Sequence, residues 1–126
     1  MTDFLGFLQE TNLIGGDWVG ADSGKTIPVT NPATGEVIGH VPDSGTAETE
    51  SAIAAAAEAF RTWSRTDLNL RVGLLHKLHD ALMENQEPLA RLLTAEQGKP
   101  LFEARGEIAI GAAYVRWFAE EIRRAK

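Results

Sequence analysis

The acidic side chains that could do chemistry are Glu103 and Glu107, which stand one helical turn apart. A carboxylate pair of this kind serves acid/base catalysis when it lies in a cleft that shifts one pKa. Arg105 stands between the two in sequence, and this pattern is more typical of a solvated helix edge. We therefore predict no catalytic residue here.

A second pair, His76 and His79, could place two imidazoles on one metal ion. Tetrahedral zinc needs a third and usually a fourth ligand, and the only other histidine, His40, is far away in sequence. Two partly exposed helix histidines, with Asp80 four residues beyond His76, are the better interpretation. The sequence predicts no metal site.

The segment from Gly20 to Thr26 looks like a phosphate-binding loop at first sight. A true loop of that kind has four residues between its glycines and opens a helix, whereas here three residues intervene and a strand is expected to follow. The chain also contains no cysteine, which excludes a thiol nucleophile, a disulfide and a thiolate metal site within it. We expect no cofactor-binding residue in this loop.

Composition indicates one globular domain with a modest core, since the chain has 126 residues of which 44% are hydrophobic. The net charge of -6 and the lack of a basic cluster argue against nucleic acid as a partner. The apolar run Ile108–Val115 is far shorter than the roughly 20 residues that cross a membrane. The first residues lack the pattern of a signal peptide, and we expect a cytoplasmic protein.

The first third of the sequence has the pattern of short strands. Residues 1–12 form an arm or a short helix. Leu13–Val19 and Lys25–Thr30 are predicted to pair as a β-hairpin around a turn at Gly20–Gly24. Asn31–Gly35 is a second turn, and a third short strand runs from Glu36 to Val41.

The pattern of apolar residues in the rest of the sequence predicts about four helices, so we expect the chain to be mostly helical. The first has Thr46 as its N-cap and recurrent apolar residues, and the second, from about Thr66 to Glu84, carries a leucine stripe. Asn85 caps the third, which ends at Gly98 in left-handed conformation. The last runs from Pro100 to about Arg124. The two apolar series are Ile53, Ala57, Phe60 and Trp63 in the first helix and Leu70, Leu74, Leu78 and Leu82 in the second.

The last helix has no polar face over Ile108–Val115, and a helix that is apolar all round is normally buried on all sides. Covering it completely is difficult for a chain of 126 residues. We therefore expect further protein against it, either a downstream segment or another subunit. The alternative is that its small alanine and glycine residues tolerate exposure.

Four segments, in order and at matching separations, resemble the N-terminal quarter of an NAD(P)-dependent aldehyde dehydrogenase. They are Ile14–Trp18, with Gly15 where asparagine is usual, Asn31–Ile38, the helix that ends at Trp63, and Leu92–Leu101. Within that family, Glu103–Ile108 followed by Trp117–Glu121 is most similar to succinate-semialdehyde dehydrogenases.

The resemblance implies an α/β parent enzyme of three domains, of which this chain is the N-terminal part of the cofactor-binding domain. Within it, residues 1–12 are the arm, 13–42 the β-hairpin and third strand, and 44–126 a helical layer. In the family a cysteine thiolate attacks the aldehyde, hydride passes to NAD or NADP, and water activated by a glutamate releases the acid. Those residues, the main cofactor contacts and the catalytic and oligomerisation domains lie downstream, so none is carried over and no cofactor is expected on this chain.

One contribution to function is implied for the present residues. In the family the last helix lines one wall of the aldehyde entrance, which makes Gly111, Tyr114 and Phe118 candidate wall residues. The alternative is that Tyr114, Trp117 and Phe118 are ordinary core. The expected function is thus part of an enzyme that oxidises succinate semialdehyde to succinate, inactive by itself. The alternative from another class is a stand-alone helical interaction module.

Overall fold

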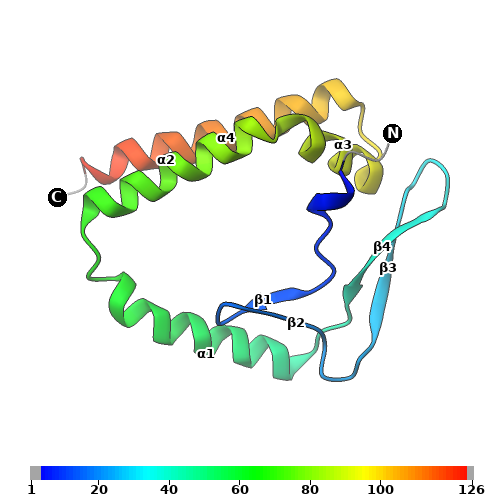
Figure 1. Ribbon diagram of the computed structural model, residues 1–126, viewed down its shortest axis with the longest axis horizontal. Helices are drawn as coiled ribbons and strands as arrows, with labels where there is room; N and C mark the ends of the chain where they lie inside the picture. The colour runs from blue at the N-terminus through cyan, green and yellow to red at the C-terminus, as the bar shows by residue number, and fades with distance from the viewer. Residues whose placement is uncertain (1–3, 125–126) are drawn as a thin grey trace. The chain divides into compact units, whose positions relative to one another are not determined.

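The computed structural model describes residues 4–124, which form two compact units (Figure 1). The first unit comprises residues 8–65, and the second comprises residues 4–7 with 66–124. The fold class is confirmed: short antiparallel strands precede four helices, which hold most of the described residues.

The predicted pairing of the first strands is wrong. β1 (Asn12–Ile14) pairs with β2 (Asp17–Val19) across the two-residue turn Gly15–Gly16, whose φ angles are 63° and 93°. Positive φ at both central residues is the requirement of a type I′ hairpin turn, which glycine and asparagine satisfy. The expected strand Leu13–Val19 is therefore two strands, and Gly15 lies in their turn.

The second hairpin joins β3 (Thr26–Thr30) to β4 (Val37–Pro42). Its turn is the predicted one: the Asn31 side chain accepts a hydrogen bond of 2.9 Å from the Ala33 N–H, and Gly35 has φ 76°. The strand after the Gly20–Gly24 turn, β3, thus pairs with β4, which follows it in sequence, and not with the strand before the turn. Because that turn leads into β3, it lacks the following helix that a phosphate-binding loop requires.

Helix α1 (Thr46–Trp63) begins at Thr46, the residue predicted as its cap, because Gly45 is its N-cap. Glu48 in its first turn is the buried residue of this helix. The predicted apolar stripe is largely uncovered: Ile53 and Phe60 are 64% and 65% exposed, and Trp63 is exposed as well. The face of α1 that approaches β1 consists of alanines instead.

The second unit holds α2 (Leu68–Glu84), α3 (Gln86–Gln97), α4 (Leu101–Ile122) and the short 3-10 helix η1 (Leu5–Phe7). Their boundaries follow local signals. The Asp67 carboxylate caps α2 by accepting from the Asn69 and Leu70 N–H groups, and Gly98 ends α3 with φ 87° as predicted. Pro100 caps α4. Asn85 is the N-cap of α3 as predicted, but its side chain donates to the Ala81 carbonyl of α2 and makes no capping hydrogen bond.

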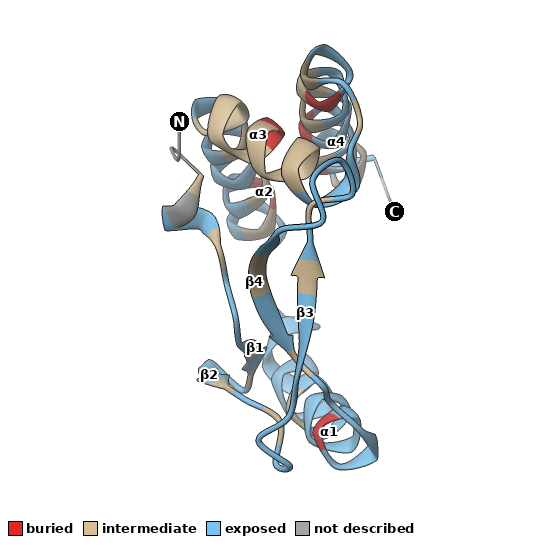
Figure 2. Cartoon of the chain, turned by 90° about the vertical axis from the view of Figure 1, so that its right-hand side faces the viewer, coloured by how far each residue is buried: buried red, intermediate tan, exposed pale blue. Residues whose placement is uncertain are grey.

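The core of this unit is the seam where α4 packs on α2 and α3, and Figure 2 shows the buried positions in red. Its members within the described residues are Val72, Ala90, Ala104, Ala112 and Ala119. The leucine stripe of α2 lies on the other side, since Leu70, Leu74 and Leu78 are exposed. Alanines allow close approach of the two helix backbones, so α2 presents Val72 to the seam.

The burial of α4 on all sides that its composition predicts is not found among the described residues. One face packs on α2, while Ile110 and Tyr114 on the other are 61% and 62% exposed. None of the helices between residues 4 and 124 combines the length and apolarity that a membrane span requires.

Candidate functional site

The outer face of α4 carries an apolar groove. Ile110, Ala113, Tyr114, Trp117 and Phe118 line it, and its volume is about 480 Å³. Its four large side chains are each about 60% exposed, while Ala112 and Ala119 of the same helix are buried against the seam. The helix is therefore apolar on two faces, and only the alanine face is covered.

Two of the three predicted wall residues lie in this groove. Tyr114 and Phe118 line it, whereas Gly111 is exposed beside it and a Cβ added there would meet nothing within 4 Å. Sequence reasoning missed Ile110, Ala113 and Trp117. Their spacing of three and four residues was a readable signal, because such positions share one helix face.

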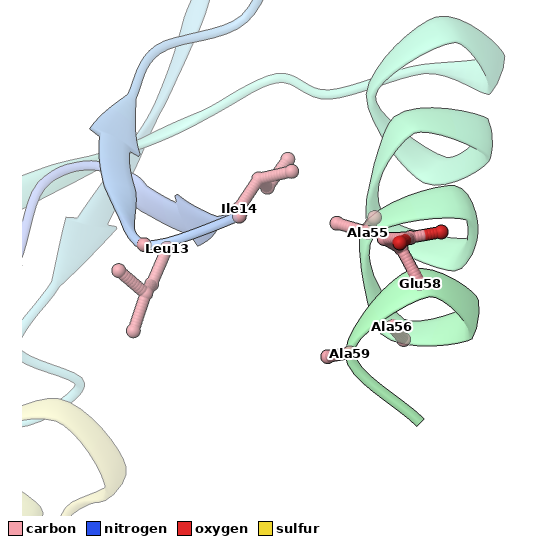
Figure 3. A pocket seen from close by; sticks show the side chains of 9 residues that line it. Leu13, Ile14, Ala55, Ala56, Glu58 and Ala59 are labelled. Atoms are coloured by element: carbon pink, nitrogen blue, oxygen red, sulfur yellow. The ribbon is translucent and has the colours of Figure 1, made fainter. Parts of the chain in front are cut away.

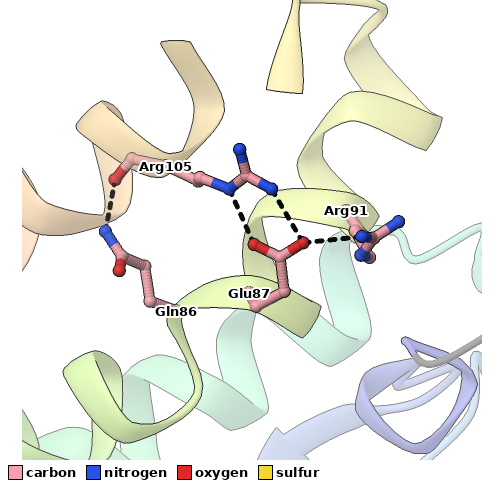
Figure 4. A network of polar contacts seen from close by, with 4 residues as sticks. All are labelled: Gln86, Glu87, Arg91 and Arg105. Carbon is pink, nitrogen blue, oxygen red and sulfur yellow. Dashed lines mark hydrogen bonds and ion pairs between the residues drawn. The ribbon is translucent and has the colours of Figure 1, made fainter. Parts of the chain in front are cut away.

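Ion pairs hold α4 in place. Arg105 donates through Nε and Nη2 to the two carboxylate oxygens of Glu87 on α3, at 2.7 and 3.0 Å (Figure 4). Arg91 reaches the same carboxylate at 2.7 Å, and Gln86 donates to the Arg105 carbonyl. The hydrogen bond from Arg105 and the charges of both arginines lower the pKa of Glu87 to about 2. This network joins α3 to α4, and the lining of the groove contains no charged residue.

The acidic pair on α4 has no catalytic arrangement. Glu103 and Glu107 are exposed, Glu107 forms an ion pair with Lys99, and Arg105 turns to Glu87. This is the solvated helix edge that the sequence indicated.

The histidines are likewise separated. His76 Nε2 lies 2.9 Å from Glu120 on α4, and His79 Nδ1 lies 2.9 Å from Asp80. Asp80 is therefore the partner of His79 and not of His76. In the part of the chain that the structure describes, no three potential ligands converge.

A second groove, of about 590 Å³, lies between the first hairpin and α1 (Figure 3). Leu13 and Ile14 line it together with a row of small side chains of α1. The charged residue in the lining is Glu58, which pairs with Arg61 at 3.1 Å. The row consists of Ala52, Ala55, Ala56 and Ala59. A groove lined this way can take an apolar segment, and the carboxylate in its lining, Glu58, is engaged by Arg61.

Glu48 ties the start of α1 to the turn after β2. Its two carboxylate oxygens accept hydrogen bonds from the Asp22 N–H at 2.5 Å and from the Gly45 N–H at 2.7 Å. The two N–H groups, that of Asp22 first, hold the pKa of Glu48 below its usual value. Glu48 therefore occupies the helix terminus that an anion would otherwise bind.

The other helix starts are acidic too, because Asp67 caps α2 while Glu87 and Glu103 stand in the first turns of α3 and α4. The phosphates of a dinucleotide bind at helix N-termini that are free of negative charge. The described residues thus do not fit a nicotinamide cofactor by themselves, and no reaction step through one is assigned to them.

The sequence was compared with known proteins. Residues 18–126 match the aldehyde dehydrogenase family. A glutarate-semialdehyde dehydrogenase of Pseudomonas putida is 55% identical over 111 residues, which are 88% of this chain and 23% of that protein. An NADP(+) succinate-semialdehyde dehydrogenase of Escherichia coli is 47% identical over 116 residues, or 92% of this chain and 24% of that protein.

Solved structures agree with the sequence comparison. The crystal structure of succinate-semialdehyde dehydrogenase from Burkholderia pseudomallei is 45% identical, with a TM-score of 0.94 over 97% of this chain and 25% of that one. Solved structures of related betaine aldehyde dehydrogenases contain NAD+. This chain spans about a quarter of the length of the relatives it matches.

Proposed function

Because this chain belongs to the aldehyde dehydrogenase family, we propose that it supplies the N-terminal part of the cofactor-binding domain of an NAD(P)-dependent semialdehyde dehydrogenase. The observation that carries the proposal is the 55% identity to a glutarate-semialdehyde dehydrogenase. Succinate semialdehyde is the proposed substrate, because the segments Glu103–Ile108 and Trp117–Glu121 resemble that subgroup and the E. coli relative named for that substrate is 47% identical. The proposed site of action is the cytoplasm.

The chain by itself has no catalytic activity under this proposal. It contains no cysteine to attack the aldehyde, and acidic side chains stand in the first turns of α3 and α4. The purified chain should produce no NADH or NADPH from succinate semialdehyde, as followed at the absorbance of the reduced cofactor. Isothermal titration should show no micromolar binding of NAD or NADP. Turnover or such binding would refute the claim.

The activity of the whole enzyme can be tested with a chimera. This chain replaces the matched first quarter of the Burkholderia succinate-semialdehyde dehydrogenase, and kcat/KM is measured for succinate and glutarate semialdehydes. We expect an active enzyme that prefers succinate semialdehyde. An inactive but folded chimera, or a preference for the longer substrate, would contradict the proposed substrate.

The contribution of this chain to that activity is one wall of the aldehyde entrance, formed by Gly111, Tyr114 and Phe118. Two of these residues line the groove on α4, and the third keeps its edge free of a side chain. In the chimera, Phe118→Ala should shift the preference toward longer or bulkier aldehydes by about tenfold, the effect of one or two methylene-sized differences in a pocket. Phe102→Ala, at an exposed aromatic of α4 outside the groove, is the control. An unchanged preference in Phe118→Ala would remove the wall assignment.

The alternative, a helical interaction module without enzymatic activity, is favoured by one observation: the apolar groove on α4 is uncovered. Size-exclusion chromatography with light scattering distinguishes a monomer from an assembly. A monomer that shows no sign of association would count against an obligate partner.

A further inference from the structure

The hairpin of β3 and β4 is a two-stranded sheet, so each strand has an outer edge that pairs with no further strand among the described residues. The ladder shows which main-chain groups point outward. The Asp43 N–H donates to the Lys25 carbonyl, and in an antiparallel pair such inward-facing positions alternate with outward-facing ones. The N–H and C=O groups of His40, and the C=O group of Pro28 opposite it, therefore point away from the partner strand.

An outer edge of this kind is a template on which another strand can pair, and folded proteins normally protect it. Two prolines give part of that protection, because proline has no N–H to donate. Pro28 interrupts the outer edge of β3, and Pro42 interrupts that of β4. His40 lies two residues before Pro42 and keeps its outward N–H. This donor needs protection of another kind.

Glu10, which precedes β1, lies at this donor. Its Oε1 atom accepts a hydrogen bond of 2.7 Å from the His40 N–H, and the His40 Nδ1 atom is 3.8 Å from the same oxygen. A Cβ added at the neighbouring Gly39 would lie 3.4 Å from Glu10 Oε1 and 3.9 Å from Leu8 Cδ2. Leu8 and Glu10 thus lie close against β4, where a glycine leaves room for them.

We infer that Glu10 protects the outer edge of β4, and that the partner it excludes is β4 of a second copy of this chain. Two copies related by a two-fold axis can pair antiparallel at His40, whose N–H and C=O groups then bond to those of the same residue in the other copy. A longer ladder with an unrelated strand would meet Pro42, which has no N–H. The inference does not depend on the proposed function.

The first experiment measures hydrogen exchange of the His40 amide by NMR in the whole chain at neutral pH. Glu10→Ala should speed this exchange about three- to tenfold, the range that corresponds to one net hydrogen bond. Glu10→Gln keeps an acceptor oxygen and should remain near wild type. Glu50→Ala removes an equal charge from an exposed position on α1 and is the control. An unchanged rate in Glu10→Ala would overturn the protective role.

The second experiment identifies the excluded partner by disulfide formation, which is specific because the chain has no cysteine of its own. Residues directly opposite each other in a hydrogen-bonded antiparallel pair have Cα atoms about 5.5 Å apart, a separation that a disulfide can bridge. Under mild oxidation, His40→Cys combined with Glu10→Ala should therefore form a covalent dimer. His40→Cys alone should form about three- to tenfold less, because Glu10 still occupies the edge.

Two further variants separate edge protection from other causes of association. Glu50→Cys combined with Glu10→Ala places the thiol on α1 and should give only the dimer that random collision produces. His40→Cys combined with Glu10→Gln should behave like His40→Cys alone. If it instead dimerises as readily as the Glu10→Ala combination, charge repulsion between copies explains the effect and the inference is wrong. Faster amide exchange without dimerisation through residue 40 would refute the second copy as the excluded partner.

Discussion

At the scale of the residue, the carboxylates of this chain position backbone and helices instead of doing chemistry. Glu48 and Glu87 both have pKa values lowered by hydrogen-bond donors, which in an unknown protein is a reason to consider a functional site. Here the donors are the N–H groups of Asp22 and Gly45 for the first and Arg105 for the second. Each carboxylate thus joins two segments of one unit, and its lowered pKa is a consequence of that structural role.

Glu87 makes this testable through pH. Its pKa is about 2 in the folded chain against an ordinary 4.5, so the ionised form stabilises the fold above pH 4.5. That stabilisation is lost as the pH falls from about 4.5 toward 2. Thermal midpoints measured by circular dichroism should decline over this window, and the decline should be smaller in Glu87→Gln. Glu103→Gln, at an exposed carboxylate of α4, should keep the wild-type profile. A Glu87→Gln profile parallel to wild type would contradict the assignment.

At the scale of the element, the first hairpin depends on a turn that only certain residues can form. Gly15 has φ 63°, and a Cβ there would also lie 3.8 Å from that of Ala55. Gly15→Ala should lower the free energy of unfolding by about 1 kcal/mol, because L-residues are strained in this region. Gly15→Asn should cost much less. Gly20→Ala is the matched control, since its surroundings are open and its φ is not positive. Urea unfolding measures all three, and an equal loss in Gly15→Ala and Gly20→Ala would reject the turn argument.

The seam of α4 offers a test at adjacent positions on opposite faces. Ala112 is fully buried where α4 packs on α2, while Ala113 next to it is exposed. Ala112→Leu should destabilise the chain by about 1–3 kcal/mol, because overpacking forces helices apart. Ala113→Leu should change the unfolding free energy little, because it only extends into the groove. If both variants unfold at the same urea concentration, α4 does not pack by its alanine face.

The helix boundaries were predictable because their signals are local. Gly98 in left-handed conformation was predicted directly from the sequence, and the predicted start of α4 at Pro100 is one residue early, because Pro100 is its cap. The pairing of the first strands was not predicted correctly. The sequence contains two glycine-containing turns, Gly15–Gly16 and Gly20–Gly24, and the first hairpin forms around Gly15–Gly16.

The packed faces and the groove were harder to predict for a physical reason. The leucine stripe of α2 is the more hydrophobic side of the helix, yet small residues on α4 made Val72 the contact. Such choices depend on the partner surface, which periodicity within one helix cannot reveal. For the same reason, Ile110 and Trp117 were not predicted as part of the candidate site, although their spacing places them on one helix face.

At the scale of the whole molecule, the described residues bury little large apolar surface. Five apolar residues among them are buried, and four of these are alanines. The heat capacity of unfolding reports the apolar area newly exposed, and a typical domain of this length would give about 1.5–1.9 kcal/mol/K. Calorimetry on this chain should give a clearly lower value. The native chain should also bind a hydrophobic dye such as ANS, because large apolar side chains are exposed in the native state.

The exposed side chains of the groove on α4 permit a control on that expectation. An Ile110→Ser, Trp117→Ser double variant should bind less dye and unfold with nearly the same heat-capacity change, because both side chains are more than half exposed before unfolding. A typical heat-capacity change in the wild-type chain would mean that these surfaces are covered in solution. Light scattering on the same sample would then show whether a second copy covers them, since such an assembly would depend on protein concentration and a monomer would not.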